Sequence, residues 1–436
     1  MTDRSEINVG IIGFGTVGTG TARILLNQAR EIERRIGFPV RLKRIADLDI
    51  KKDRGLKLPK GMLVNNVSAV INNPEIDIVV ELIGGIHPAK EFVLNALKNS
   101  KHVVTANKAL LATEGRLLFN AAKKYKVALG FEAAVAGAIP IIKVVRESMA
   151  GDRIKSIYGI INGTANYILS KMTYEGMDFT TALNEAKALG YAEADPTFDI
   201  EGIDSAHKIA ILASLCFGLP FSFKKIYTEG ITGIAPIDIQ FATEFGYKIK
   251  LLAIAKQSGN EVEVRVHPTM LPKDYLISNV NGVLNAVYIE SEAAGPGLYY
   301  GRGAGEMPTG NAVVSDIIDI ARGIKNCSQQ RIQGLGMPEN PGVTFKNMDD
   351  VYTSYYLRLT ALDKPGVLSR ISGILGKHNI SIRSMIQKSR EKKAVPVVMM
   401  THKAREKDMA KALREINKLS SVAEKTVFIR VEGEEE

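Results

Sequence analysis

The segment YAEADPTFDIEGIDSAHK, residues 191–208, gathers acidic side chains in front of a lysine. Helical periodicity begins near Ile203 and ends near Gly218, which predicts that Asp204 and Lys208 lie four residues apart on one helix face. A protonated lysine can polarise a carbonyl oxygen and then protonate the alkoxide that hydride addition produces. The segment therefore contains residues suited to the reduction of a carbonyl group.

Other interpretations of the same segment stay open at this point. Asp204 could cap the helix, with Lys208 as its ion-pair partner at the surface. Carboxylates also bind magnesium or calcium, although the calcium-loop spacing D-x-[DN]-x-[DN]-G is absent. The density of acids at Glu193, Asp195 and Asp199 favours a polar pocket that binds a cationic group such as an ammonium.

Further side chains bear on the type of reaction. Lys108, in VVTANKALL, follows a predicted strand and is a second candidate beside a nicotinamide, with a solvated lysine at a helix end as the alternative. Oxidation of an aldehyde through a thioester would need an activated cysteine near a base. Cys216 lies in an apolar helix and Cys327 in a predicted linker, so reduction of an aldehyde to an alcohol is favoured.

A glycine-rich turn follows the apolar run INVGII and precedes an amphipathic helix. Its sequence matches G-x-G-x-x-G, in which the glycines allow a tight turn, close approach of a pyrophosphate and close packing of the helix. An ordinary glycine turn is the alternative, but the flanking strand and helix favour a dinucleotide site. The predicted cofactor-binding residues are Gly13, Phe14, Gly15, Thr16, Val17 and Gly18.

The end of the second predicted strand bears on the choice between NAD and NADP. Asp47 could accept a hydrogen bond from a ribose 2′-hydroxyl, which would favour NAD. Basic residues follow closely and could instead bind a 2′-phosphate, so the preference stays open; they are Lys51, Lys52, Arg54 and Lys57.

Alternation of strands and helices predicts a Rossmann-type parallel sheet at residues 1–140. An α+β substrate-binding and dimerisation domain is predicted at 141–325, and its last helix could return to the first domain. A segment rich in Gly, Pro, Asn and Gln predicts a linker at 326–352. Residues 353–432 have the βαββαβ order of a ferredoxin-like domain.

Composition narrows the class of protein. The formal charge is +10, but the basic residues are scattered, which argues against nucleic-acid binding. No apolar run has the roughly 18 to 20 residues that span a bilayer, and the N-terminus lacks a signal-peptide pattern, so we expect no membrane association and a cytoplasmic location. Two cysteines exclude a disulfide framework.

The segment AKALGYAEADPTFDIEGIDSAHK resembles the signature of the homoserine dehydrogenase family along its full length. VVTANKALL, FEAAVAGAIPII and INGTANYIL are similar to other segments of this family, so the resemblance covers about residues 7–325. It implies reversible NAD(P)H-dependent reduction of L-aspartate 4-semialdehyde to L-homoserine, on the route to threonine, methionine and isoleucine. One departure is Phe198, where some members have a second acid.

The resemblance also implies roles for individual residues. Lys208 would donate the proton, Asp204 would orient the site, and Lys108 would lie near the nicotinamide and the substrate. The implied substrate-binding residues are Glu193, Asp199 and Tyr191. The implied additional cofactor-binding residues are Thr105, Lys108, Gly303 and Gly305. A sodium-like cation would be bound at Glu132, Val135, Gly137 and Ile139, a set that the residue pattern alone does not indicate.

The C-terminal unit, with its LDKPGVL turn and HNISI segment, looks like an ACT domain. That resemblance implies an amino-acid effector, threonine in the first place, and a homodimer or homotetramer, with a purely oligomerising module as the alternative. The implied effector-binding residues are Asp363, Gly366, Val367, Asn379 and Ile380. Two other functions remain as alternatives: a non-catalytic regulator that senses nucleotide and amino acid, and a reductase of another small amino-acid carbonyl.

Overall fold

The computed structural model describes residues 5–326, 340–387 and 394–433. Cys327 and residues 327–339 of the predicted linker lie outside the described residues. The chain forms two compact units between which it passes several times. The first unit comprises residues 1–156, 207–225 and 284–343, and the second comprises 157–206, 226–283 and 344–436. The predicted domain limits stay predictions.

The first unit is built on a six-stranded sheet with the order β3-β2-β1-β4-β5-β6, in which every neighbouring pair is parallel. This is the strand order of a doubly wound dinucleotide-binding fold. The central strands β1, β4 and β5 are almost entirely buried because helices cover both faces of the sheet. The six strands are β1 (Ile7–Ile12), β2 (Val40–Ala46), β3 (Leu63–Val64), β4 (Ile78–Glu81), β5 (His102–Thr105) and β6 (Leu129–Gly130).

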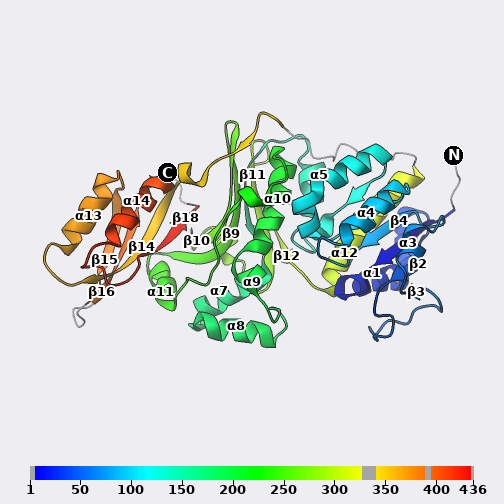
Figure 1. Cartoon of the computed structure of the whole chain (residues 1–436), viewed down its shortest axis with the longest axis horizontal. Coiled ribbons are helices and arrows are strands. Elements are labelled where there is room, and N and C mark those ends of the chain that lie inside the picture. The colour runs from blue at the N-terminus through cyan, green and yellow to red at the C-terminus, as the bar shows by residue number, and fades with distance from the viewer. Residues whose placement is uncertain (1–4, 327–339, 388–393, 434–436) are drawn as a thin grey trace. The chain divides into compact units, whose positions relative to one another are not determined.

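The helices of this unit lie on both sides of the sheet (Figure 1). Helices α4 and α5 pack together on one side, while α1 packs against α12 on the other. Apolar residues of α12 join the same core as β1 and α1, although nearly three hundred residues separate these elements in the sequence. The helices are α1 (Thr16–Asn27), α2 (Ala29–Ile36), α3 (Ser68–Ile71), α4 (Ala89–Lys98), α5 (Lys108–Tyr125), α6 (Ile141–Lys143) and α12 (Glu306–Lys325).

The rest of the first unit consists of short helical turns, a hairpin and most of helix α10. Strands β11 (Leu284–Ser291) and β12 (Pro296–Arg302) form the antiparallel hairpin. Helix α10 (Ile203–Phe217) begins in the second unit and continues in the first from His207. The short turns are the 3-10 helices η1 (Glu132–Ala134) and η3 (Phe223–Lys225) and the π-helix η2 (Val144–Ser148).

The second unit contains a mixed sheet in which β7, β9, β10, β18, β14, β16 and β15 are neighbours in that order. Its longest pair is antiparallel, between β9 (Tyr247–Ser258) and β10 (Glu261–Pro272). The alternating sequence EVEVRV at the start of β10 is typical of a strand. The other elements before the C-terminal domain are β7 (Ile154–Ile160), α7 (Gly163–Glu175), α8 (Phe179–Ala188), α9 (Thr197–Ile200), β8 (Tyr227–Thr228), α11 (Pro236–Glu244), η4 (Leu276–Asn279), β13 (Thr344–Phe345) and η6 (Met348–Asp350).

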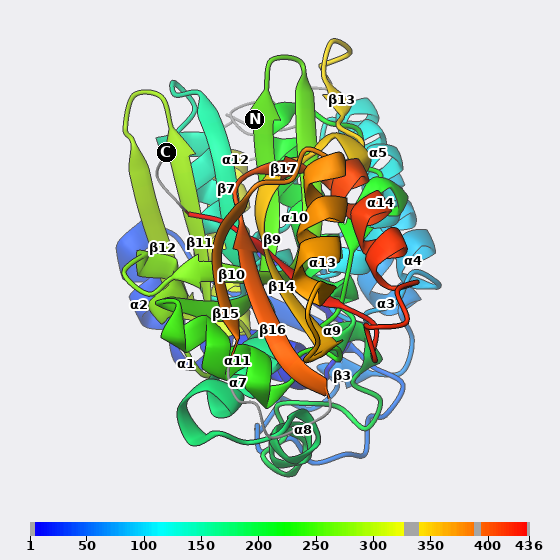
Figure 2. The same ribbon diagram turned by 90° about the vertical axis from the view of Figure 1, so that its left-hand side faces the viewer.

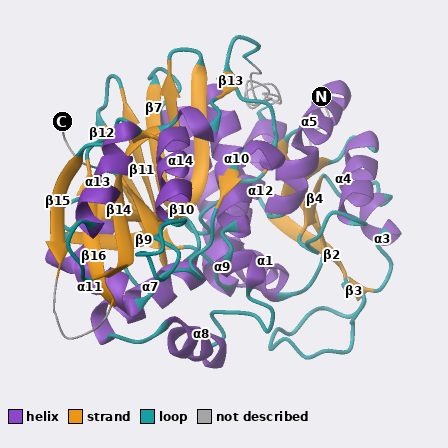
Figure 3. Cartoon of the chain, turned by 60° about the vertical axis from the view of Figure 1, so that its left-hand side comes forward, coloured by secondary structure: helices purple, strands orange, loops and turns teal. Residues whose placement is uncertain are grey.

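The C-terminal part of the second unit has the predicted βαββαβ order, with one additional two-residue strand, β17 (Ala404–Arg405). Two helices cover one face of its strands (Figures 2 and 3), and apolar side chains of both helices form a separate core with the sheet. The α/β fold class with a Rossmann-type sheet and an ACT-like domain is therefore confirmed. The elements are β14 (Tyr352–Leu362), α13 (Val367–Lys377), β15 (Ile382–Gln387), β16 (Ala394–Thr401), α14 (Glu406–Ile416) and β18 (Val427–Val431).

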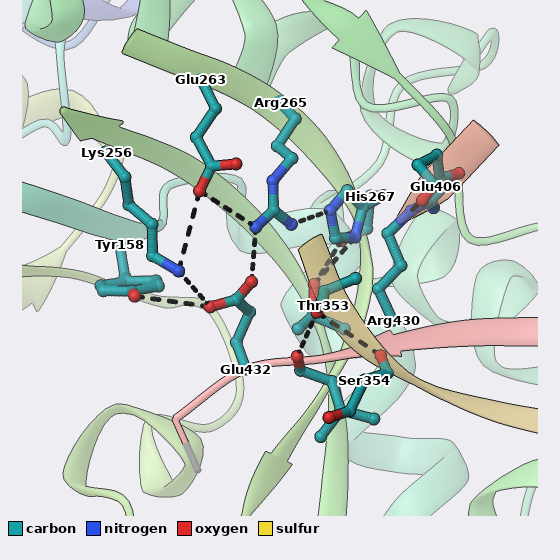
Figure 4. A network of polar contacts seen from close by, with 12 residues as sticks. Tyr158, Lys256, Glu263, Arg265, His267, Thr353, Ser354, Glu406, Arg430 and Glu432 are labelled. Carbon is teal, nitrogen blue, oxygen red and sulfur yellow. Dashed lines mark hydrogen bonds and ion pairs between the residues drawn. The ribbon is translucent and has the colours of Figure 1, made fainter. Parts of the chain in front are cut away.

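A buried ionic network accompanies the pairing of β18 with β10 (Figure 4). Glu432 forms ion pairs with Arg265 and, at 2.6 Å, with Lys256. Burial would raise the pKa of Glu432, but Arg265 and Lys256 lower it to about 2. Arg430, one per cent exposed, donates to Glu406 at 2.9 Å. The Glu432 carboxylate stays charged because cations surround it.

No helix among the described residues is both long enough and apolar enough to cross a membrane.

Candidate active site

Gly13 and Gly18 of the nucleotide loop occupy positions that disfavour a side chain, whereas Gly15 lies in open space. Gly13 has φ +99°, and a Cβ atom on it would lie 2.7 Å from the backbone of Leu82. A Cβ atom on Gly18 would lie 2.1 Å from the carbonyl oxygen of Gly13. A Cβ atom on Gly15, at the N-terminus of α1, would meet nothing within 4 Å. Backbone atoms therefore pack closely against Gly13 and Gly18, while the space at Gly15 is open. Open space at the helix N-terminus is what a bound phosphate requires.

Asp47 is linked to this loop by its own hydrogen bonds. Its carboxylate accepts from the Phe14 backbone N–H at 2.6 Å and from Arg54 at 3.0 Å. The guanidinium of Arg54 also donates to the Phe14 carbonyl and lies over the Phe14 ring, 4.9 Å from its centroid. The structure thus places an acid and a base together at the end of β2, where a ribose would bind.

The second glycine cluster lies against the same side of the first unit. A Cβ atom on Gly20 of α1 would lie 2.1 Å from the Glu306 carbonyl oxygen, so α12 approaches α1 closely at its N-terminus. Arg23 of α1 pairs with Glu306 at 2.9 Å. Gly305, with φ +125°, caps α12 and forms the turn into it. Of the predicted cofactor residues, Gly305 directly precedes this contact between α12 and α1, and Gly303 lies against Gly137 and Asn285.

The carboxyl ends of β4 and β5 bring further polar groups together, and binding sites of doubly wound folds form at such ends. Thr105 donates to the buried carboxylate of Glu81 at 2.7 Å. Burial raises the pKa of Glu81. Asn107 caps α5 by accepting from the Leu110 N–H, and Lys108 is the first residue of that helix. Glu81 was not predicted; its only signal in the sequence is its place at the end of an apolar strand.

The acidic segment is organised by an asparagine that the sequence reasoning did not select. Asn162 caps α7 and donates from its Nδ2 to Asp199 at 2.6 Å and to Asp204 at 2.9 Å. One amide thus holds two of the predicted acids in the second unit. Asn162 follows β7 and begins a helix, but an asparagine at the start of a helix is common. This position alone could not identify it as a residue of the site.

The acids of this segment differ in exposure and partners. Asp204 is 4% exposed and Lys208 is 9% exposed, so their interpretation as a surface cap with a surface ion pair is wrong. Glu193 is exposed, whereas Asp195 accepts from the backbone and hydroxyl of Thr197.

Tyr191 is exposed and packs edge-on against Tyr167, with ring centroids 5.0 Å apart. Its carbonyl oxygen accepts from the Thr164 hydroxyl at 2.7 Å.

One of the predicted cation ligands, Glu132, is a buried carboxyl group. The two oxygens of Glu132 accept from the backbone N–H groups of Ile142 and Lys143 at 2.8 and 3.0 Å. Burial and then the neighbouring Asp316 raise the pKa of Glu132 to about 7. Each oxygen keeps a lone pair for a further ligand. Among the described residues no group of three or more His, Cys, Asp or Glu side chains gathers as a metal site, so a cation here would depend on backbone carbonyls.

The turn that follows Glu132 contains the other three predicted ligands, Val135, Gly137 and Ile139. Ala136 and Gly137 both have positive φ angles, +56° and +58°, which produce a tight turn. The Ile139 carbonyl accepts from the Ile141 N–H at 2.8 Å and retains its second lone pair. One carboxylate and several carbonyl oxygens form a hard donor set that fits a sodium-like ion.

Comparisons with known proteins agree with this geometry. Family models match at three places: the homoserine dehydrogenase NAD-binding domain at 13–132, homoserine dehydrogenase at 140–318, and the ACT domain at 355–421. A homoserine dehydrogenase of Neisseria gonorrhoeae is 46% identical over 430 residues, which cover 98% of this chain and 99% of that protein.

Solved structures give the same result. A homoserine dehydrogenase from Thiobacillus denitrificans matches with a TM-score of 0.93 and 48% identity, covering 98% of each chain. A hyperthermophilic archaeal homoserine dehydrogenase in complex with NADPH matches with a TM-score of 0.62 and 29% identity, covering 72% of this chain and 97% of that one. This chain belongs to the homoserine dehydrogenase family.

Proposed function

We propose that this chain catalyses the reversible NAD(P)H-dependent reduction of L-aspartate 4-semialdehyde to L-homoserine. The observation that carries the proposal is the pair Asp204 and Lys208, both buried and one helical turn apart on α10. Burial of a lysine and a carboxylate is costly, so a buried pair of this kind points to chemistry rather than to stability.

In this mechanism the bound cofactor supplies the hydride, and the protein supplies the proton and the orientation of the substrate. Lys208 donates a proton from Nζ to the oxygen that becomes the homoserine hydroxyl. Asp204 orients that lysine, and its own position is fixed by the amide of Asn162. Proton donation by a positioned side chain of this kind contributes about 10²- to 10⁴-fold to a rate.

The substrate is an amino acid, and its ammonium group explains the acidic segment. We assign Asp199 and Glu193 to that ammonium, with Tyr191 at the edge of the same segment. Asp199 is oriented by the amide of Asn162, at 2.6 Å. Lys108, at the start of α5, acts on the cofactor side because it follows Thr105 at the carboxyl end of β5.

For the cofactor we propose that the nucleotide loop, from Gly13 to Gly18, binds the pyrophosphate at the N-terminus of α1. Asp47, the residue that would favour NAD, already pairs with Arg54. Lys51 and Lys52 are exposed beside that pair. This arrangement favours the 2′-phosphate of NADPH, which Arg and Lys side chains bind. We therefore expect NADPH to be used more efficiently than NADH.

We also propose a monovalent cation at Glu132 and the carbonyl oxygens of Val135, Gly137 and Ile139. When bound there, such an ion would supply positive charge and would hold this turn in place. Glu132 provides the one negative charge of the set.

The ACT domain is proposed to bind an amino-acid effector, with threonine as the first candidate, in a homo-oligomer. Gly366 and Asn379 have positive φ angles, +84° and +58°, at the two turns assigned to the effector together with Asp363, Val367 and Ile380. Such turns expose backbone N–H and C=O groups that can bind the two ends of an amino acid. Inhibition of turnover by threonine, together with light scattering, tests both the effector and the assembly.

The function is tested by following reduced-nicotinamide absorbance when the protein is mixed with L-aspartate 4-semialdehyde, using NADPH and NADH in parallel. We expect oxidation of NADPH with stoichiometric formation of L-homoserine. Arg54→Ala should reduce the efficiency with NADPH by about tenfold and leave NADH nearly unaffected. A folded protein that binds NADPH but leaves the absorbance unchanged would instead support the nucleotide-sensing regulator or a different carbonyl substrate.

A further inference from the structure

The loop that follows β8, residues 229–232, supports the backbone directly after Asp199. This stretch is called the β8 loop below. Its Ile231 N–H donates to the Ile200 carbonyl oxygen at 2.8 Å, and Ile231 is fully buried. Asp199 and Ile200 are the last two residues of the short helix α9. The β8 loop is therefore bonded directly to the end of the helix that contains Asp199.

Two glycines allow the β8 loop to approach this backbone closely. A Cβ atom on Gly230 would lie 2.4 Å from the Ile200 carbonyl oxygen. Gly202 has φ +78°, and a Cβ atom on it would lie 3.4 Å from the Glu229 carbonyl oxygen. Because backbone packs on backbone here, a shift of the β8 loop would also displace the end of α9.

The side chain of Glu229 anchors the β8 loop to the C-terminal domain. Arg430 of β18 donates from Nη1 to the Glu229 carboxylate at 2.9 Å. The Tyr227 hydroxyl donates to the same carboxylate at 3.0 Å. The Arg430 guanidinium also lies over the Tyr227 ring, 4.8 Å from its centroid. One arginine of the C-terminal domain thus holds the loop that supports α9.

Arg430 has another carboxylate as its counter-ion. It is 1% exposed and donates from Nε and Nη2 to Glu406 of α14 (Figure 4). A carboxylate bound by two guanidinium nitrogens in this way already balances the buried charge. The Glu229 side chain is 35% exposed, and ion pairs with solvent access add little stability. The contact between Arg430 and Glu229 is therefore better explained by the position it gives to the β8 loop.

We propose that Arg430, through Glu229 and the β8 loop, positions Asp199 for the ammonium group of the substrate. Arg430 is thus a positioning residue that the C-terminal domain contributes to the substrate site. This inference rests on the proposed function. Small displacements of a group that binds substrate cost much of its interaction, even when the change that causes them is remote.

Steady-state kinetics on two variants test this role. Glu229→Ala removes the anchor at a partly exposed position, so the fold should persist. Arg430→Lys keeps the buried charge but loses the planar fork that reaches Glu406 and Glu229 together. In both variants we expect the KM for L-aspartate 4-semialdehyde to rise about tenfold, while kcat and the dissociation constant of NADPH change less than about twofold.

A conservative variant and a double variant sharpen the test. Glu229→Gln keeps an oxygen that can accept from Arg430 and Tyr227, so its KM should stay within about threefold of the wild type. The double variant Glu229→Ala/Arg430→Lys should raise KM no further than either change alone, because each removes the same contact.

Arg358→Lys is the matched control for Arg430→Lys. Arg358 lies on the neighbouring strand β14 and also binds a carboxylate outside the C-terminal domain. It donates from Nε and Nη2 to Asp238 of α11, at 2.6 and 3.0 Å. This contact does not involve the β8 loop, so the control should leave the KM for the semialdehyde within about twofold of the wild type.

Hydrogen exchange separates positioning from a general loss of stability and needs no turnover. In Glu229→Ala the amides of Ile231 and of residues 200–202 should exchange about tenfold faster than in the wild type, because their support is weakened. The amides of α11 and α13 should exchange at the wild-type rate.

Several results would overturn the proposal: an unchanged KM in Glu229→Ala, additive effects in the double variant, an equal rise of KM in Arg358→Lys, or faster exchange throughout the second unit. Failure of the proposed function is distinguishable from these. It would appear as absence of semialdehyde reduction by the wild type, whereas the exchange measurements would still show whether Glu229 supports the end of α9.

Discussion

Buried polar groups in the two units differ in the partners that the protein gives them. In the second unit, Glu432 is surrounded by Arg265 and Lys256, and its pKa is lowered to about 2. In the first unit, Glu132 is buried with a pKa raised to about 7, and the Asn285 amide has no partner among the described residues. In the first arrangement the buried carboxylate has cationic partners within the protein, whereas the Asn285 amide of the second has no partner among the described residues.

This difference separates groups that stabilise the fold from groups that serve binding. A charged network with all its carboxylates paired gains little from a ligand, and removing one member leaves a buried charge unpaired. A buried group without a partner costs free energy until a ligand pairs with it. Substitutions in the two regions should therefore have opposite effects on stability and on binding.

The largest effect on stability is expected from Glu432→Gln. The substitution removes the carboxylate nearest to Arg265 and Lys256 and leaves them only the longer pairs with Glu263, at 3.5 and 3.7 Å. The free energy of unfolding should therefore fall by about 3 to 5 kcal/mol in urea titrations. Glu415→Gln is the control, because Glu415 pairs with His378 and Lys377 where solvent has access. The control should lose less than about 1 kcal/mol. Equal losses in both variants would show that the buried network around Glu432 contributes no more to the free energy of unfolding than an exposed ion pair.

A smaller effect is expected from acid. Burial and then Arg430 and Arg265 hold the pKa of His267 well below its usual value. Below about pH 6.5 the unfolded chain binds a proton at this histidine that the folded chain does not, so stability falls as the pH falls. Between pH 7.5 and 5 this residue alone should remove about 2 kcal/mol.

Urea titrations of the wild type and of His267→Asn at both pH values measure this contribution. The variant should show the flatter dependence on pH. A second loss should appear in the wild type below about pH 4.5, as protonation of Glu432 becomes favourable in the unfolded chain, and Glu432→Gln should lack it. Parallel profiles for the wild type and both variants would contradict the assignment.

The smallest effect is expected from the cation. A ligand that binds only the folded state stabilises it, so replacing choline chloride by sodium chloride should raise the melting temperature by about 1 to 3 °C. Glu132→Gln should abolish this difference, and Glu147→Gln, a nearby exposed residue, should retain it. An identical sodium effect in the Glu132 variant would place the ion elsewhere.

Local patterns in the sequence predicted the alternating strands and helices of the first domain. The nucleotide loop could be predicted because strand, glycine turn and helix are adjacent, and the structure shows the conformations that Gly13 and Gly18 require. Asp204 and Lys208 could be placed on one helix because their spacing of four residues is itself structural information. Strand β9 could not be predicted, since the apolar run KIKLLAIAKQ is compatible with a buried helix or strand.

The missed polar residues depend on contacts between distant parts of the sequence. Asn162 is 42 residues from Asp204 in sequence, and no local pattern links them. Glu432 lies beside the acidic C-terminal end, where a run of glutamates resembles solvated sequence, yet its partner Arg265 lies 167 residues earlier. Asn285 becomes notable only when the partners of its amide are known. Tertiary structure, not residue type, distinguishes these three residues from ordinary polar side chains.

The most direct test of the central claim is a paired measurement on Lys208→Ala, with turnover of L-aspartate 4-semialdehyde and the dissociation constant of NADPH determined on the same preparation. The account predicts that turnover falls about 10²- to 10⁴-fold while NADPH affinity changes little, because Lys208 donates the proton and does not hold the cofactor. Near-normal turnover in this variant would contradict the assigned role of Lys208 and the mechanism built on it.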